Sequence, residues 1–162
     1  MGCCNVGNEK KSNINFKCPV CSNDGVKVQN ITLESHLNDE SMIKLDANLI
    51  YKFCKNEDCE VIYFSEDFNK IFKKYNLKTK VTLKDSGLDV NVCYCFGHTR
   101  KSVLDEIKST GESMVLDDVK KKMKDPGCFC EKSNPQGGCC LSNVKDWVTK
   151  AKMINCKRKL EL

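Results

Sequence analysis

The chain has 162 residues, a formal net charge of +5, and 13 cysteines beside only two histidines. No apolar run approaches the roughly 18 residues of a membrane-spanning helix, and the first fifteen residues lack the apolar core of a secretory signal. We therefore expect a cytoplasmic protein with no membrane insertion. The weak basic excess also argues against nucleic-acid binding, which usually brings more positive charge and clustered aromatic residues.

The cysteines are expected to bind metal. Their number is odd and no export signal precedes them, so a disulfide framework is the poorer interpretation. About 40% of the residues are apolar and 30% are charged, which leaves a thin hydrophobic core. Small domains with so little core need a cross-link, and metal bound by thiolates is the one that this composition offers.

The N-terminal half is predicted to be rich in strands. Residues 1–16 are polar and are expected to form a flexible tail, and residues 17–84 are assigned to a strand-rich domain. Apolar residues alternate with polar ones over 26–33 and again over 81–83, a period of two that is typical of strands. Gly, Ser and Asp then interrupt this pattern, so residues 85–92 are predicted to be a linker.

A hairpin is the most distinct feature expected in this domain. The runs LIYKF (49–53) and VIYF (61–64) are rich in the β-branched and aromatic residues that favour strands. The sequence KNED between Cys54 and Cys59 has the composition of a turn. The hairpin would therefore carry two thiols at its tip.

Residues 93–155 are predicted to form three helices, followed by a basic C-terminal end at 156–162. The first helix takes Thr99 as its N-cap and ends near Gly111. The Asp-Pro-Gly sequence at 125–127 stops the second helix, and the third begins just after an adjacent pair of cysteines. The expected fold class is therefore α+β, a small strand-rich domain followed by a three-helix domain.

Two pairs of cysteines in the strand-rich domain match a zinc site. Cys18 and Cys21 form a CxxC turn that points two sulfurs at one ion, and Cys54 and Cys59 supply a second pair. Four thiolates complete a tetrahedral shell at about 2.3 Å per Zn–S bond. Because such a shell leaves no open position for water, zinc at this site would be structural.

The helical domain holds a second set of cysteines. They are the CxC motif Cys93 and Cys95, then Cys128 and Cys130, then the adjacent Cys139 and Cys140. Sulfurs beside a helix N-terminus lie near free amides and the positive end of the helix dipole, which favour negative charge. A 2Fe–2S cluster with four thiolates has a net charge of about −2 and suits that environment. The spacing alone leaves zinc as an alternative.

These motifs, taken in order, carry a resemblance to a known family. CPVC, YKFCKNEDCEVIYF, VCYCFGHT and CEKSNPQGGCC resemble the N-terminal region of CopZ-type copper chaperones, over roughly residues 17–150. The second part also resembles the bacterioferritin-associated ferredoxin (BFD) type of 2Fe–2S domain. The resemblance implies a zinc-binding domain followed by a BFD-like 2Fe–2S domain.

The resemblance also implies which cysteines bind metal. The zinc ligands fall on Cys18, Cys21, Cys54 and Cys59, and the cluster ligands on Cys93, Cys95, Cys130 and Cys140. Cys130 and Cys140 are chosen by the spacing around the Asn-Pro loop of the family. A cluster shell that uses Cys128 or Cys139 remains an alternative.

The function that the resemblance implies is copper handling. The cluster would supply the electron that reduces divalent copper to monovalent copper, for delivery to a P-type copper ATPase or a separate copper-binding domain. The electron donor is unknown. Family members carry a C-terminal copper-binding domain of ferredoxin-like fold, for which this chain has no room before Leu162. The adjacent thiols Cys3 and Cys4 are soft ligands that suit transient binding of monovalent copper.

Two other functions fit the same residues. A general electron-transfer ferredoxin, serving another reductase or an iron store, would need no copper binding. A non-redox interaction module with two zinc sites would be colourless. The chain has no P-loop, no Gly-rich dinucleotide motif and no Ser-His-Asp set, so the most enzymatic activity we expect is reduction of copper ions.

Overall fold

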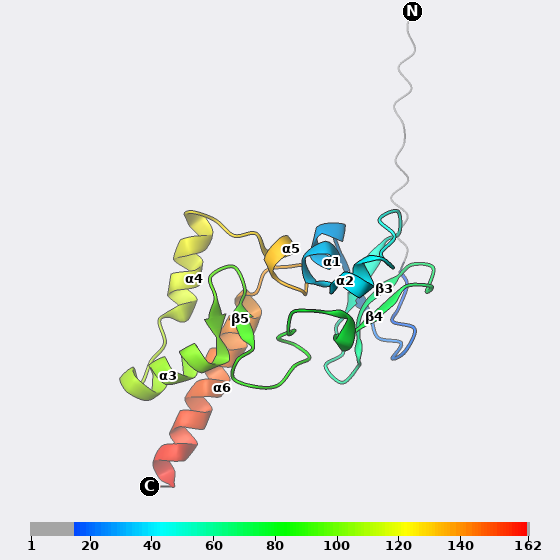
Figure 1. The fold of residues 1–162 in the computed structure, drawn as a ribbon. Coiled ribbons are helices and arrows are strands. Elements are labelled where there is room, and N and C mark those ends of the chain that lie inside the picture. The colour runs from blue at the N-terminus through cyan, green and yellow to red at the C-terminus, as the bar shows by residue number, and fades with distance from the viewer. Residues whose placement is uncertain (1–14, 162) are drawn as a thin grey trace, which may run out of the picture.

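The computed structural model describes residues 15–161, which form a strand-bearing part and a helical part lying side by side (Figure 1). The strand-bearing part contains β1 (Gly25–Val28), α1 (Asn30–His36), α2 (Asp39–Met42), β2 (Tyr51–Cys54), β3 (Val61–Ser65), β4 (Ile71–Lys73) and the 3₁₀ helix η1 (Lys74–Asn76). The helical part contains β5 (Asn91–Cys93), β6 (His98–Thr99), α3 (Arg100–Thr110), α4 (Val115–Lys124), α5 (Cys130–Ser133) and α6 (Leu141–Leu160). The mixed α+β fold class is therefore confirmed.

The first part is built on a four-stranded antiparallel sheet. Its strand order is β1-β2-β3-β4, and the predicted hairpin is the central pair, with Tyr51 opposite Ser65 and Phe53 opposite Tyr63. All five residues of β3 are buried. A strand buried on both faces needs an apolar run without polar alternation, and VIYF supplies it.

Two of the predicted strands are wrong. Residues 30–36 form helix α1, whose buried residues Thr32, Leu33 and His36 follow the spacing of one helix face. Residues 81–83 form a turn in which the carbonyl of Val81 accepts hydrogen bonds from the N–H groups of Lys84 and Asp85. Alternation over three or four residues does not separate a strand from a helix turn or a tight turn.

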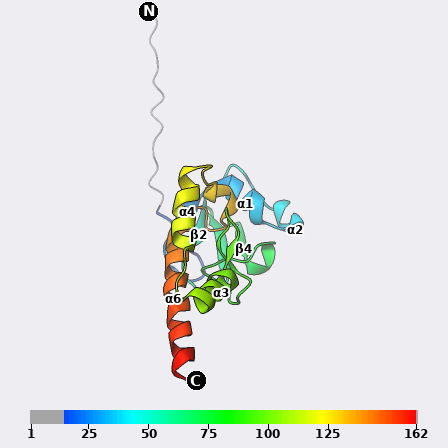
Figure 2. The same ribbon diagram turned by 90° about the vertical axis from the view of Figure 1, so that its left-hand side faces the viewer.

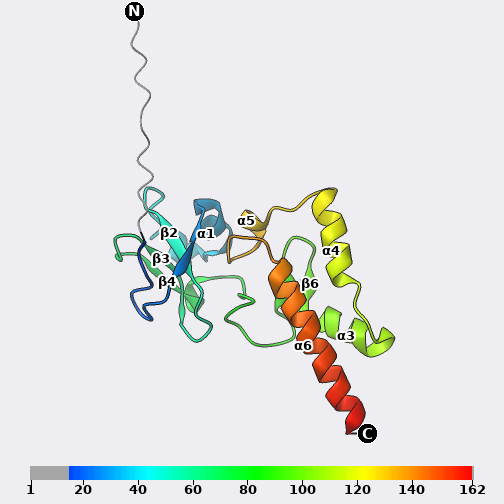
Figure 3. The same ribbon diagram turned by 180° about the vertical axis from the view of Figure 1, so that it is seen from behind.

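The helical part packs around a core of aliphatic side chains from α3, α4 and α6. Thr99 caps α3 as predicted by accepting from the N–H of Ser102, and Gly111 ends the helix with a φ of 84°. The part has a fourth helix, the short α5, so the prediction of three helices was incomplete. Helix α6 continues through Leu160, beyond the predicted end at 155, and its C-terminal half projects past the rest of the described chain (Figures 2 and 3).

The boundary between tail and domain also shifts by one residue. Phe16, which was assigned to the tail, is buried with its ring centroid 5.5 Å from that of Phe64. Its apolar area belongs to the small core beside the first cysteine set. Within residues 15–161, no helix has the length and apolarity needed to cross a membrane.

The two parts are joined by hydrogen bonds as well as by the chain. The hydroxyl of Thr32 in α1 donates to the carbonyl of Glu131 in α5 at 2.5 Å, and the hydroxyl of Tyr63 in β3 donates to the carbonyl of Pro135 at 2.5 Å. Figure 1 shows α5 beside α1 at this junction. The loop that connects α5 to α6 is therefore held against the sheet-bearing part.

Candidate metal centres

The first cysteine set comes together at one end of the sheet. Cys18 and Cys21 lie in the turn before β1, Cys54 ends β2, and Cys59 lies just before β3. The four sulfur atoms all lie within 4.8 Å of one another, with 3.9 Å from Cys18 to Cys59 and 3.6 Å from Cys21 to Cys54. Four Zn–S bonds of about 2.3 Å in a tetrahedron would place the sulfurs about 3.8 Å apart. The donor set therefore fits a zinc ion.

Main-chain amides surround this first set of sulfurs. Burial acts against the thiolate of Cys21, but hydrogen bonds from the main chain of Asn23 and from neighbouring side chains lower its pKa to about 6. Burial raises the pKa of Cys54 to about 12 and also raises that of Cys59. A bound cation favours the thiolate form of buried sulfurs, as in a structural thiolate site.

The second cysteine set comes from three separate segments of the helical part. Cys93 ends β5, Cys95 lies in the turn before β6, Cys130 is the first residue of α5, and Cys140 is the N-cap of α6. The CxC motif was expected beside a helix N-terminus. It lies instead in a small hairpin, because α3 begins only at Arg100. Cys140, in contrast, stands at a helix N-terminus as predicted.

The second-set sulfurs are spread more widely than those of the first set. Cys95 and Cys130 have sulfurs 3.7 Å apart, and the side chain of Cys140 lies close enough to Cys93 to lower its pKa. Among residues 15–161, only the first set has all of its ligand atoms within 4.8 Å. Four thiolates that are spread more widely than the ligands of one ion suit a cluster with two metal ions.

The thiols of the second set differ in how readily they lose a proton. The hydrogen bond from Cys140 lowers the pKa of Cys93 to about 6, against the effect of burial and with help from the main chain of Phe96. Burial raises the pKa of Cys130 to about 12, and the bond with Cys93 raises that of Cys140. The site has amide donors and a helix N-terminus that favour negative charge at sulfur.

The remaining cysteines differ in exposure. Cys128 is half-buried and its thiol contacts that of Cys130, whereas Cys139 is exposed beside Cys140. The choice between these ligands therefore stays a prediction. Cys156 is exposed on α6. The predicted copper ligands Cys3 and Cys4 lie outside the described residues.

Sequence reasoning missed one polar residue next to the first centre. Lys84 is 7% exposed, and its ammonium donates to the carbonyls of Asn56, Cys59 and Val61. A lysine among the polar residues of a predicted strand and linker gives no sign that it is buried. Only the folded turn shows its role.

The family of the first part follows from its sequence. Residues 15–78, which include all four cysteines of the first centre, match the family described as the CopZ zinc-binding domain. This part of the chain is a CopZ-type zinc-binding domain. The predicted resemblance is thus confirmed for the N-terminal part.

Similarity to CopZ extends beyond this domain. The chain is 33% identical over 125 residues to the copper chaperone CopZ of Archaeoglobus fulgidus, an alignment that covers 77% of this chain. It spans 58% of the length of that protein. The X-ray structure of the CopZ N-terminal domain from the same organism is 31% identical, with a TM-score of 0.66 over 81% of this chain and 96% of that one. The helical part is therefore included in the structural match.

Proposed function

We propose that this CopZ relative is a metal-homeostasis protein that holds a structural zinc ion at the first centre and a redox-active 2Fe–2S cluster at the second. The observation that carries the proposal is that Cys93, Cys95, Cys130 and Cys140 come together from three segments but are spread more widely than the four sulfurs of the first centre. When bound, a 2Fe–2S cluster supplies one electron at a time. One electron converts one divalent copper ion to monovalent copper, which is the reaction proposed here.

The residues of the second centre are suited to hold a cluster and to limit access of water. Cys93, Cys130 and Cys140 are buried, whereas Cys95 is partly exposed. Partly buried Phe96 packs against the same core, and the ammonium of Lys122 lies 5.7 Å from its ring centroid. An electron would therefore enter and leave on the side of Cys95.

The proposed partners follow from the proposed reaction. A reductant of the cell restores the electron after each copper ion is reduced, and its identity is left open. Monovalent copper prefers thiolates, so we place its transient binding at Cys3 and Cys4 and its delivery at a P-type copper ATPase or a separate copper-binding domain. We propose a cytoplasmic location, because metal-bound thiolates and such partners are typical of that compartment.

A second candidate is a ferredoxin that transfers electrons without copper. Within residues 15–161, the first set is the only group of three or more ligands whose atoms all lie within 4.8 Å of one another. A cluster at the second centre is all that this candidate requires of the chain. Both candidates require the same cluster and differ only in the acceptor of the electron.

The first experiment is the visible absorption spectrum of anaerobically purified protein, before and after dithionite. Charge-transfer bands that bleach on reduction would support the cluster. A colourless protein that also fails to reconstitute with iron and sulfide would overturn it in favour of a second zinc site.

The second experiment separates the two candidates. Reduced protein, freed of dithionite, receives divalent copper together with a chromogenic chelator specific for monovalent copper. Formation of one chelated ion per oxidised cluster supports copper reduction. A cluster that stays reduced, or that reacts with copper only by falling apart, would favour the general ferredoxin.

A further inference from the structure

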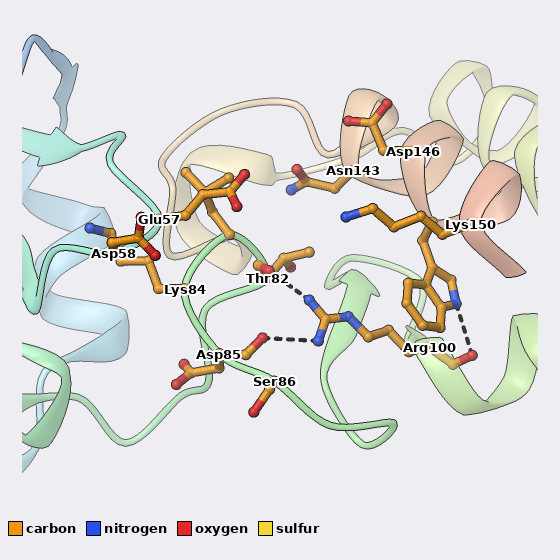
Figure 4. A pocket seen from close by; sticks show the side chains of 12 residues that line it. Glu57, Asp58, Thr82, Lys84, Asp85, Ser86, Arg100, Asn143, Asp146 and Lys150 are labelled. Atoms are coloured by element: carbon orange, nitrogen blue, oxygen red, sulfur yellow. Dashed lines mark hydrogen bonds between the residues drawn. The ribbon is translucent and has the colours of Figure 1, made fainter. Parts of the chain in front are cut away.

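A tight turn at residues 81–85 lies between the two candidate centres. The carbonyl of Val81 accepts from the N–H groups of Lys84 and Asp85, and the N–H of Val81 donates to the Asp85 carboxylate at 2.7 Å. Figure 4 shows Thr82, Lys84 and Asp85 between the hairpin tip of the first part and the helices of the second. The turn is therefore placed to touch both.

On one side, Lys84 binds the loop that carries the first centre. Its ammonium donates to the carbonyls of Asn56 at 2.8 Å, Cys59 at 3.0 Å and Val61 at 2.7 Å. These contacts use all three donors of an ammonium group. They fix the loop that runs from Cys54 to β3 and includes the ligand Cys59.

The charge of Lys84 also matches this first centre. Four thiolates around a divalent ion leave a net charge of about −2, which a nearby ammonium offsets. If the loop opened, the buried ammonium would lose its three carbonyl partners, which is strongly unfavourable. The position of the turn therefore depends on the loop that the metal closes.

On the other side, the same turn holds the CxC hairpin. Tyr94, between Cys93 and Cys95, accepts from the N–H of Thr82 at 3.1 Å and donates to the carbonyl of Lys80 at 2.5 Å. The hydroxyl of Thr82 also donates to the carbonyl of Asn91 in β5 at 2.5 Å. The hydroxyl of one tyrosine thus ties two cluster ligands to the turn.

Arg100 adds a third connection, which Figure 4 shows in the pocket beside the turn. Its guanidinium donates to the carbonyls of Thr82 at 2.8 Å and Asp85 at 2.9 Å. The carbonyl of Arg100 accepts from the indole N–H of Trp147 in α6 at 2.9 Å. The turn is therefore anchored to α3 and α6, which belong to the core around the second centre.

We propose that Lys84 and Tyr94 are positioning residues that make the two metal centres interdependent through the turn at 81–85. Metal at the first centre closes the loop on Lys84, the turn is fixed, and Tyr94 then holds Cys93 and Cys95 in place. By thermodynamic linkage, loading of the second centre favours the first to the same extent. The inference rests on the proposed ligand sets and not on copper as the electron acceptor.

The test measures the alkylation rates of Cys93 and Cys95 by mass spectrometry in cluster-free protein, with and without zinc. Zinc is expected to slow alkylation by about fivefold or more, the lower end of typical coupling between linked sites. Tyr94→Phe keeps the ring but removes the hydroxyl that bonds to Thr82 and Lys80, so zinc should no longer protect these thiols from alkylation. Tyr75→Phe removes a hydroxyl from a residue that is 74% exposed, and should retain the protection.

Lys84→Met supplies the second arm of the test. It should speed the removal of zinc by a chelator and reduce protection of Cys93, whereas Lys78→Met, at an exposed lysine, should do neither. Gly137→Ala, in which the new Cβ would lie 2.6 Å from Cγ1 of Val28, controls for a general loss of stability, because zinc should still protect the CxC thiols in that variant.

Cluster-loaded protein gives an independent readout. Zinc-depleted wild type should lose its visible bands faster than zinc-loaded wild type, and Tyr94→Phe should remove the difference. The proposal would be overturned if zinc protected Cys93 and Cys95 from alkylation in Tyr94→Phe as fully as in the wild type. It would also be overturned if zinc did not change the alkylation rates of the wild type. A protein that fails to reduce copper leaves the alkylation result unchanged, so the two proposals fail separately.

Discussion

The hydroxyl of Tyr63, buried in β3, donates a hydrogen bond of 2.5 Å to the main-chain carbonyl of Pro135 in the helical part. Burial raises the pKa of Tyr63 above its ordinary value, so the hydroxyl stays protonated and remains a donor. Pro135 lies in the loop that leads to Cys140. The central strand of one part therefore holds the loop that carries a ligand of the other centre.

Tyr63→Phe removes this bond and leaves a carbonyl in the interface without its partner. The expected cost is about 1–3 kcal/mol in the free energy of unfolding, the usual range for an unpaired buried group. Urea unfolding of metal-loaded protein measures it. Tyr75→Phe, which alters a hydroxyl on an exposed side chain, is expected to change stability by less than about 0.5 kcal/mol. Equal effects from both variants would contradict the role of the Pro135 contact.

Gly137 and Gly138 offer a matched pair of substitutions in this loop. Gly137 has a φ of 72°, and a Cβ there would lie 2.6 Å from Cγ1 of Val28, whereas a Cβ at Gly138 meets nothing within 4 Å. Gly137→Ala should therefore destabilise the protein by about 1–3 kcal/mol, while Gly138→Ala should have little effect. Thermal unfolding of the two variants in parallel checks this difference.

The parts of the structure that were predicted correctly are those set by local sequence. The aromatic and β-branched runs at 49–53 and 61–64 form the central hairpin, and Thr99 and Gly111 bound α3. In each case the residues that decide the conformation are neighbours in the chain. The spacing of cysteines indicated a CxxC turn and a hairpin tip, but the closest sulfurs, Cys18 to Cys59 and Cys21 to Cys54, come from segments far apart in the chain.

The parts that were missed depend on contacts between distant segments. Helix α1 was predicted to be a strand because four residues of alternation fit a strand and a helix equally well. Its packing against α5, which the sequence does not show, favours the helix. Lys84 belongs to a turn whose partners lie 23 to 28 residues earlier in the chain. No periodicity or motif encodes such a contact, so only the fold reveals it.

The zinc proposal predicts different outcomes for two cysteines. Cys54→Ser removes a buried sulfur of the first centre, so purified protein should lose most of its zinc. Cys156→Ser, at an exposed thiol on α6, should retain a full equivalent. The zinc content of the two purified variants is measured by elemental mass spectrometry. Full retention in Cys54→Ser would remove this residue from the proposed shell.

The cluster proposal predicts a split among adjacent cysteines. Cys130→Ser and Cys140→Ser should lose the visible charge-transfer bands, because each removes a buried sulfur that is a proposed cluster ligand. Cys128→Ser and Cys139→Ser should keep them. Spectra of the four variants after anaerobic reconstitution test the assignment, and retained bands in both Cys130→Ser and Cys140→Ser would disprove it.

His36 provides a prediction about pH that does not involve the proposed ligands. It is 5% exposed, its Nδ1 lies 3.0 Å from the hydroxyl of Thr79, and its ring lies edge-on to Tyr94. Burial, together with the positive charge of Lys78, lowers its pKa from 6.5 to about 4. The folded state therefore keeps the imidazole neutral at pH values where the unfolded chain would protonate it.

Because the unfolded state binds more protons between these two pKa values, stability is expected to fall as pH drops from about 6.5 toward 4. The linkage amounts to about 2 kcal/mol between pH 7 and pH 5. His36→Gln removes the titration, so its stability should fall less than that of the wild type over this interval. Acid release of metal affects both proteins alike and cancels in the comparison. If His36→Gln loses as much stability as the wild type in urea unfolding at both pH values, His36 is not the group responsible.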